Sequence, residues 1–213
     1  VEERATMNLN DPTKPMVALG LMSGTSLDGI DAALLETDGE TVLDIGPSLT
    51  IPYPDDFRRR LKKEVELASS TDQITTDTEL ITDLTSLHIT SVQKLLSLET
   101  TFGKWSAPQV IGFHGHTTLH RPEHHITQQI GNPDQLANAI GVPVVADFRV
   151  RDVELGGQGA PLAPIFHASM FRSKSKPICV VNIGGISNIT WIGKGCDELI
   201  AFDTGPGNGL LDA

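Results

Sequence analysis

The chain lacks a long apolar run, a framework of paired cysteines and an excess of positive charge. None of its apolar runs approaches the roughly 20 residues that a membrane-spanning helix needs. Residues 1–14 are polar, so we expect neither a signal peptide nor a membrane anchor. The two cysteines, Cys179 and Cys196, allow one disulfide, but they fit two incidental thiols of an intracellular protein better. These absences together predict a cytoplasmic protein.

The charge balance narrows the range of partners. Asp and Glu number 27 against 16 Lys and Arg, which gives a formal net charge of −11. Such an excess of negative charge argues against nucleic acid and acidic membranes as partners. It leaves nucleotide binding open, because backbone amides and Mg²⁺ can contact the phosphates. Hydrophobic content of 39% and charged content of 20% predict a globular protein.

Strand-like and helix-like apolar patterns alternate along the first two thirds of the chain and predict a mixed α/β fold. Pro52 and Pro54 close the third predicted strand, and Gly141 caps a short helix. We expect strands at 16–21, 30–36 and 41–51, helices at 55–67 and 72–100, a short buried strand at 110–113 that ends at a Gly/His turn, a helix at 133–140 and a strand at 142–146.

A cluster of Gly and Pro at 147–164 predicts a domain boundary, because the apolar pattern restarts beyond it. Apolar segments follow at 177–183, 186–192 and 199–202. A strand–glycine turn–strand unit therefore occurs twice, at 16–36 and 177–192, which favours a duplicated domain over a coincidence of two common hairpins.

The predicted domains are unequal in size. We expect a flexible terminus at 1–15, a complete first domain at 16–146 and an incomplete second domain at 147–213. The second segment has room for three strands and one helix that starts after Pro206, too little to cover its apolar strands. The sequence therefore resembles a truncated one.

The first candidate site is the polar tip between the first two predicted strands. Gly24 and Gly29 allow backbone conformations that other residues avoid and let a ligand approach the main chain. Successive backbone amides, together with the hydroxyls of Ser23, Thr25 and Ser26, form a plausible phosphate cradle. The alternative is an ordinary polar hairpin turn.

Two carboxylates, Asp28 and Asp31, lie in the same segment and are candidates to hold Mg²⁺, directly or through water.

The second candidate site is Asp203. An apolar strand leads to this residue, and Gly205, Pro206 and Gly207 are expected to turn the chain immediately afterwards. Strand ends of α/β folds commonly carry reactive groups, and a carboxylate there suits a general base. The alternative is a structural carboxylate that caps the next helix.

Imidazoles and hydroxyls gather after the strand at 110–113, where His114 and Thr117 are candidates to recognise a small hydroxylated ligand. One alternative is that these are ordinary surface histidines. The other is a metal site, because three more histidines follow, but the spacing of the histidines fits no familiar zinc motif. The three that follow are His120, His124 and His125.

Arg149 and Arg151 follow the strand at 142–146, and Arg suits a bidentate grip on a carboxylate or phosphate. A solvated cluster of ion pairs with the neighbouring carboxylates is an equally good interpretation.

Taken together, these segments resemble the anhydro-N-acetylmuramic acid kinase family. The matching stretches run in family order from about residue 16 to 213: GLMSGTSLDGIDAALLE, IGFHGHTTLHRP, TQQIGNPDQLA, VVADFRVRDVELGGQGAPLAP, VVNIGGISNIT and FDTGPGN. The resemblance implies an actin-like ATPase fold, in which two ribonuclease-H-like domains close over ATP, and a homodimer.

The resemblance also implies an activity. Such a kinase opens the 1,6-anhydro ring of anhydro-N-acetylmuramic acid by hydrolysis and phosphorylates O6 with ATP and Mg²⁺, giving N-acetylmuramic acid 6-phosphate for cell-wall recycling. Asp203 would be the base that activates water, and Thr117, Arg149 and Arg151 would lie near the sugar. The ATP phosphates would be held by the family segment Gly24, Thr25, Ser26, Leu27, Asp28, Gly29, Ile30 and Asp31.

The chain departs from the pattern at two residues and in its length. His116 stands where the family usually has Gln, and Met22 stands where most actin-like ATPases have a Mg²⁺-linked Asp. Asp28 or Asp31 would then serve the ion, or water and phosphate alone would hold it. The family continues well beyond Ala213, so we expect the 213-residue chain by itself to be inactive.

Two other functions stay open. A kinase of another anhydrosugar, such as levoglucosan, shares the first hairpin but tends to lack the Gln-Ile-Gly-Asn-Pro pattern found at 129–133. A non-catalytic actin-like ATP-binding module is the other; Asp203, Arg149 and Arg151 favour an enzyme over it.

Overall fold

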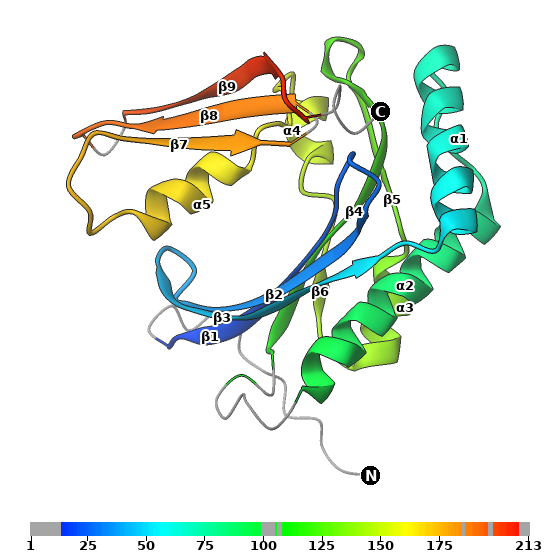
Figure 1. Cartoon of the computed structure of the whole chain (residues 1–213), viewed down its shortest axis with the longest axis horizontal. Coiled ribbons are helices and arrows are strands. Elements are labelled where there is room, and N and C mark those ends of the chain that lie inside the picture. Colours follow the sequence, from blue (N-terminus) through cyan, green and yellow to red (C-terminus); the bar gives the residue numbers. More distant parts are fainter. Residues whose placement is uncertain (1–13, 99–104, 106–107, 185, 196–197, 209–213) are drawn as a thin grey trace.

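The computed structural model describes residues 14–98, 105, 108–184, 186–195 and 198–208, and its strands form two sheets (Figure 1). The larger sheet has the order β3-β2-β1-β4-β5, with β6 also paired to β4, and the smaller sheet has the order β7-β8-β9. In Figure 1, α1, α2 and α3 lie on one side of the larger sheet, and the smaller sheet with α5 lies on the other.

The larger sheet combines antiparallel and parallel pairs. β1 is antiparallel to β2 and β2 to β3, whereas β4 is parallel to both β1 and β6, and β5 folds back antiparallel on β4. This arrangement confirms the α/β fold class. The strands are β1 (Met16–Ser23), β2 (Gly29–Thr37), β3 (Val42–Pro52), β4 (Val110–Arg121), β5 (Ile126–Ile130) and β6 (Val144–Val145).

Alternating burial along the strands builds the core. In β2, Ile30, Ala32 and Leu34 are buried while Asp31 and Ala33 face outward, as expected for a sheet covered on one face. The helices α1 (Asp55–Thr71), α2 (Thr78–Ser97) and α3 (Pro133–Ile140) cover that face. They contribute the buried side chains Phe57, Leu61, Leu80, Leu84, Val92, Leu95 and Leu136.

The second part of the chain contains α4 (Val150–Glu154), α5 (Ala163–Met170), β7 (Ile178–Ile183), β8 (Ile186–Ile192) and β9 (Leu199–Pro206). Helix α5 joins the two sheets. The hydroxyl of Ser169 donates to Glu40 O and accepts from Val42 N at the start of β3, and His167 Nδ1 hydrogen-bonds to Thr190 Oγ1 on β8 at 2.9 Å.

Several predicted boundaries were wrong. β4 does not end at 113 but continues to Arg121, because Gly115 has φ +67° and lets the strand bend onward to pair with β5. Helix α2 starts at Thr78 rather than 72, because Asp77 accepts from Leu80 N as its N-cap. The strand expected at 142–146 is only β6 (Val144–Val145), and the region 147–164, expected as a domain boundary, contains α4 and the start of α5.

The remaining predictions from the sequence are either confirmed or left untested by the structure. Both predicted hairpins are confirmed, β1–β2 and β7–β8. From residue 209 on, the helix expected after Pro206 lies outside the described residues, as do residues 1–13 of the flexible terminus. The division into two domains stays a prediction.

Candidate functional site

The tip of the β1–β2 hairpin is a compact turn. β1 ends at Ser23 and β2 begins at Gly29, and between them Leu27 N donates to Gly24 O at 3.1 Å. Leu27 has φ +57°, a conformation that is uncommon for a branched side chain. The hydroxyls of Thr25 and Ser26 are exposed. Residues 24–28, which we call the hairpin loop, therefore combine exposed hydroxyls with a constrained backbone.

The carboxyl end of the hairpin loop is packed against the end of β3. A Cβ atom on Gly29 would overlap the carbonyl group of Ile51 and the Cα of Pro52, so only glycine fits there. Directly after these residues, Tyr53 N donates to Asp28 O at 3.0 Å. The backbone of β3 thus fixes where the loop ends.

The amino end of the hairpin loop is anchored by a buried chain of three side chains. Ser23 Oγ hydrogen-bonds to Tyr53 Oη and, at 2.7 Å, to His116 Nδ1 on β4. Burial raises the pKa of Tyr53 to about 12 and lowers that of His116 to about 4, so both side chains are neutral at pH 7. The Nε2 atom of His116 is buried and has no partner among the described residues.

The two carboxylates of the segment each keep one oxygen without a hydrogen bond among the described residues. Asp28 Oδ1 accepts from Ser26 Oγ at 2.7 Å and from Gly29 N at 3.0 Å, and Asp31 Oδ1 accepts from Thr50 Oγ1 at 2.5 Å. Within the described residues the Oδ2 atom of each accepts no hydrogen bond, and both side chains are exposed. Carboxylate oxygens suit Mg²⁺, which usually keeps several water or phosphate ligands.

A second polar group lies where α4 meets β4. Arg149, at the N-cap of α4, donates from Nε to His114 Nε2 at 3.0 Å and from Nη1 to Gly159 O at 2.7 Å. Since a guanidinium only donates, His114 Nε2 is the acceptor and the ring proton sits on Nδ1, which donates to Gly115 O at 2.9 Å. Burial and the charge of Arg149 lower the pKa of His114.

Thr117 lies further along β4, opposite Gln129 of β5. Gln129 Nε2 donates to Thr117 Oγ1 at 3.3 Å and to Thr127 Oγ1 at 2.9 Å, while its Oε1 is buried without a partner among the described residues. His120 lies on the same strand, and burial, followed by the charge of Arg149, lowers its pKa. Arg149 thus contacts β4 through His114.

Arg151 is not part of this group. It is exposed on α4, and in the described part of the chain its side chain makes no hydrogen bond or ion pair. The interpretation of Arg149 and Arg151 as a cluster of ion pairs is wrong for Arg149, whose partners are an imidazole and a carbonyl.

Asp203 lies inside β9 rather than at its end, which corrects the predicted turn. β9 continues through Gly205 to Pro206, because it is the edge strand of the smaller sheet and an edge tolerates Pro. Asp203 is opposite Asn188 of β8, and its exposed carboxylate has no hydrogen-bond partner among the described residues. In Figure 1 the carboxyl end of β9 and the tip of the β1–β2 hairpin both lie in the upper part of the view.

Two residues that the structure brings into these groups, Tyr53 and Gln129, were not predicted as site residues, although Gln129 begins the Gln-Ile-Gly-Asn-Pro pattern at 129–133. Tyr53 is the only tyrosine of the chain and lies between two prolines, a place typical of a loop. Gln129 belongs to a polar segment without strand-like alternation. Their partners come from β1 and β4, so only the sheet pairing reveals them.

Over the described residues, no three or more His, Cys, Asp or Glu side chains are grouped so as to hold a metal ion. The helices in the same part of the chain include none that is long and apolar enough to cross a membrane. The one described cysteine, Cys179, is exposed and free.

Comparison with known proteins identifies similar sequences. The sequence model of the family described as "Anhydro-N-acetylmuramic acid kinase" matches residues 16–213. Proteins carrying that name are 44% identical in Rhodospirillum rubrum (97% of this chain, 53% of the relative), 49% identical in Azorhizobium caulinodans (92% and 54%) and 48% identical in Acidiphilium cryptum (92% and 52%).

Similar solved structures are more distant. A Ppx/GppA family member from Aquifex aeolicus has 11% identity and a TM-score of 0.41, with 90% of this chain and 52% of that chain covered. The inorganic polyphosphate/ATP-glucomannokinase from Arthrobacter sp. strain KM has 13% identity and a TM-score of 0.32, with 84% and 58% covered.

The chain spans about half the length of the curated relatives it matches. The family model, in contrast, covers the chain from Met16 to its last residue. This chain belongs to the anhydro-N-acetylmuramic acid kinase family.

Proposed function

We propose that this chain is the ATP-phosphate-binding part of a kinase that opens the 1,6-anhydro ring of anhydro-N-acetylmuramic acid and phosphorylates its O6. The observation that carries the proposal is the family match over 16–213, joined by relatives of that name at 44–49% identity. The product would be N-acetylmuramic acid 6-phosphate, an intermediate of cell-wall recycling.

In this proposal the hairpin loop and the start of β2, residues 24–31, hold the phosphates of ATP. Exposed hydroxyls of Thr25 and Ser26 and the constrained loop backbone support this role. Asp28 and Asp31 would hold Mg²⁺, through water or phosphate ligands as well as their own oxygens. The ion, when bound, neutralises charge on the phosphates.

Arg149, Thr117 and Arg151 would bind the sugar. Arg149 donates from Nε to His114 and from Nη1 to Gly159, and its Nη2 has no hydrogen-bond partner among the described residues. A guanidinium has five N–H donors, so Arg149 retains donors for the lactyl carboxylate of the sugar. Thr117 offers a hydroxyl to a sugar hydroxyl, and the exposed Arg151 adds positive charge.

Asp203 would be the general base. Its carboxylate takes a proton from water while the water oxygen forms a bond to the anomeric carbon C1, and the C1–O6 bond breaks. O6 then attacks the γ-phosphorus of ATP, and ADP leaves. The exposure of Asp203 and its freedom from hydrogen bonds among the described residues suit a group that must accept a proton.

Incubation of the native full-length protein with ATP, Mg²⁺ and anhydro-N-acetylmuramic acid tests the proposal. We expect ADP and N-acetylmuramic acid 6-phosphate in equal amounts. ADP formation with levoglucosan but not with the muramic sugar would overturn the substrate assignment. ATP binding without any sugar-dependent hydrolysis would favour the non-catalytic module.

We also propose that the protein is a cytoplasmic homodimer, on the strength of the family resemblance. Light scattering coupled to size exclusion of the native protein measures its mass directly, and a monomer would contradict this assignment.

A further inference from the structure

The single tyrosine of the chain contacts both ends of the hairpin loop. Its side-chain oxygen hydrogen-bonds to Ser23 Oγ, one residue before the loop, and its backbone N–H donates to the carbonyl of Asp28, the last loop residue, at 3.0 Å. Tyr53 therefore ties the two ends of the loop to one residue at the end of β3.

The contact at the amino end continues into the larger sheet. Ser23 is only 1% exposed and also hydrogen-bonds to His116 Nδ1 at 2.7 Å, and His116 is fully buried on β4. β1 and β4 are parallel neighbours, and their register shifts between Leu21 and Ser23, just where this contact forms. The side chains of Ser23 and His116 thus bridge the sheet where the backbone ladder is irregular.

Few contacts form inside the loop, all of which the structure describes, and the only side-chain hydrogen bond between two of its residues runs from Ser26 Oγ to Asp28 Oδ1. The one backbone hydrogen bond within the loop is Leu27 N to Gly24 O, and Leu27 has φ +57°. A short loop with such a residue keeps its conformation only when its surroundings hold it. The surroundings that hold it are the packing of Gly29 against Ile51, the hydrogen bond from Tyr53 N to Asp28 O, and the chain of side chains from Tyr53 to His116.

We propose that Tyr53 and His116 are positioning residues for the hairpin loop, acting through Ser23 to hold the loop amides in the geometry that receives the ATP phosphates. The inference rests on the proposed function of the loop as a phosphate cradle. Neither residue touches ATP in this account. Both act by keeping the loop preorganised, which lowers the entropy lost when the phosphates bind.

Equilibrium dialysis of ATP–Mg²⁺ with the native full-length protein tests the proposal without turnover. We expect Tyr53→Phe, which removes one hydroxyl, to weaken ATP binding about tenfold, the effect of losing one buried hydrogen bond. His116→Leu is expected to weaken it at least as much. His116→Gln keeps an amide that can hydrogen-bond to Ser23, and we expect it to restore affinity to within about twofold of wild type.

Matched controls separate positioning from general loss of stability. His88 is as fully buried as His116, and its ring also has one bonded and one unpartnered nitrogen, but it contacts Leu84 O on α2. Ser91 is a buried serine that bonds to Leu87 O. We expect His88→Leu and Ser91→Ala to lower the melting temperature while leaving ATP affinity unchanged.

A second measurement follows the loop itself. Hydrogen–deuterium exchange of peptides covering 23–29 should become faster in Tyr53→Phe and stay unchanged in Ser91→Ala. Unchanged ATP affinity and exchange in Tyr53→Phe would overturn the positioning role alone, since the wild type would still bind ATP. Absence of ATP binding by the wild type would overturn the proposed function and this inference with it. Equal loss of affinity in His88→Leu and His116→Leu would also overturn the inference.

Discussion

Single residues of the candidate site differ in how far the fold restrains them. Arg149 is half-buried, donates to His114 and Gly159, and has its pKa lowered by burial. Its orientation is therefore fixed before any ligand arrives. Asp203, in contrast, is exposed on an edge strand and has no hydrogen bond among the described residues. A binding residue gains from a fixed orientation, whereas a base needs an unoccupied oxygen.

The first prediction concerns this base. Asp203→Asn keeps the size of the side chain but removes its ability to accept a proton from water. We expect turnover of the native full-length protein to fall by a factor of about 10²–10⁴, the usual contribution of a general base. ATP binding, followed by equilibrium dialysis, should be unchanged.

A matched control for this variant is Asp134→Asn, an exposed carboxylate in the first turn of α3. It should retain wild-type turnover. Retained turnover in Asp203→Asn would remove Asp203 from the mechanism.

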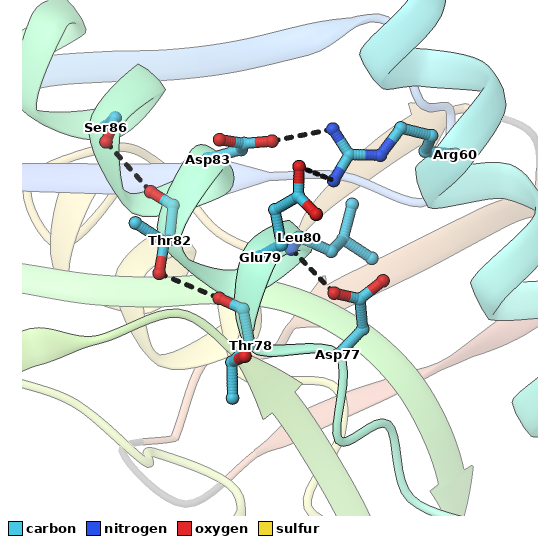
Figure 2. A network of polar contacts seen from close by, with 8 residues as sticks. All are labelled: Arg60, Asp77, Thr78, Glu79, Leu80, Thr82, Asp83 and Ser86. Atoms are coloured by element: carbon cyan, nitrogen blue, oxygen red, sulfur yellow. Dashed lines mark hydrogen bonds and ion pairs between the residues drawn. The ribbon is translucent and has the colours of Figure 1, made fainter.

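At the scale of elements, α2 shows which polar contacts hold a helix in place. Figure 2 shows Asp77 accepting from Leu80 N at 2.9 Å, and Arg60 of α1 reaching Asp83 at 2.7 Å and Glu79 at 3.9 Å. The ion pairs are partly or fully exposed, and such pairs contribute little. The cap satisfies a backbone amide that has no partner inside the helix. We therefore expect the cap to matter more than the ion pairs.

The second prediction follows from this comparison. Asp77→Ala should lower the free energy of unfolding by about 1 kcal/mol, whereas Asp77→Ser, which can still cap the helix, should lower it far less. Urea unfolding followed by circular dichroism measures both. Asp83→Ala, which breaks the ion pair instead, serves as the comparison. A larger loss in Asp83→Ala than in Asp77→Ala would contradict the ranking.

The sequence predicted elements best where their signal was local. Short apolar runs located β1 and β2, and Gly141 at its carboxyl end located α3. β5 was missed because Thr127, Gln128 and Gln129 show no apolar alternation; it is a strand only because β4 continues to pair with it. A strand that depends on its partner has no signature of its own.

The candidate site was predictable to the same extent. The glycines and hydroxyls of the segment predicted the hairpin loop, and the pairing of β1 with β2 confirms its place at the tip of a hairpin. The contact between Arg149 and His114 joins residues 35 positions apart and depends on how α4 sits on the sheet. The Tyr53–Ser23–His116 chain depends likewise on the sheet order β3-β2-β1-β4, which brings the end of β3 close to β1 and β4. Sequence patterns can indicate such residues as candidates, but they do not predict which of them contact one another in the fold.

At the scale of the whole molecule, the core contains imidazoles that burial keeps neutral. His88 on α2 and His116 on β4 are fully buried, and His88 packs edge-on against Phe113 with ring centroids 4.9 Å apart. Burial lowers the pKa of each ring from 6.5 to about 4. A charged imidazole in this core would lose its hydration without gaining a carboxylate partner, which is why the neutral form is favoured.

The last prediction is the pH dependence of stability that follows from these two rings. Between pH 6.5 and about 4 the unfolded chain binds protons on His88 and His116 that the folded protein does not. The free energy of unfolding is therefore highest above pH 6.5, falls as the pH drops through this window, and loses up to roughly 3 kcal/mol per ring by pH 4. Urea unfolding at pH 7.0, 5.5 and 4.5 measures the slope. Carboxylates also change the free energy of unfolding near the lower end of this window, so the decisive comparison is between variants. His88→Gln should flatten the slope of the free energy of unfolding against pH. His124→Gln, at an exposed position, should leave that slope unchanged. Equal slopes in the two variants would mean that the buried imidazole is not what makes the folded protein sensitive to acid.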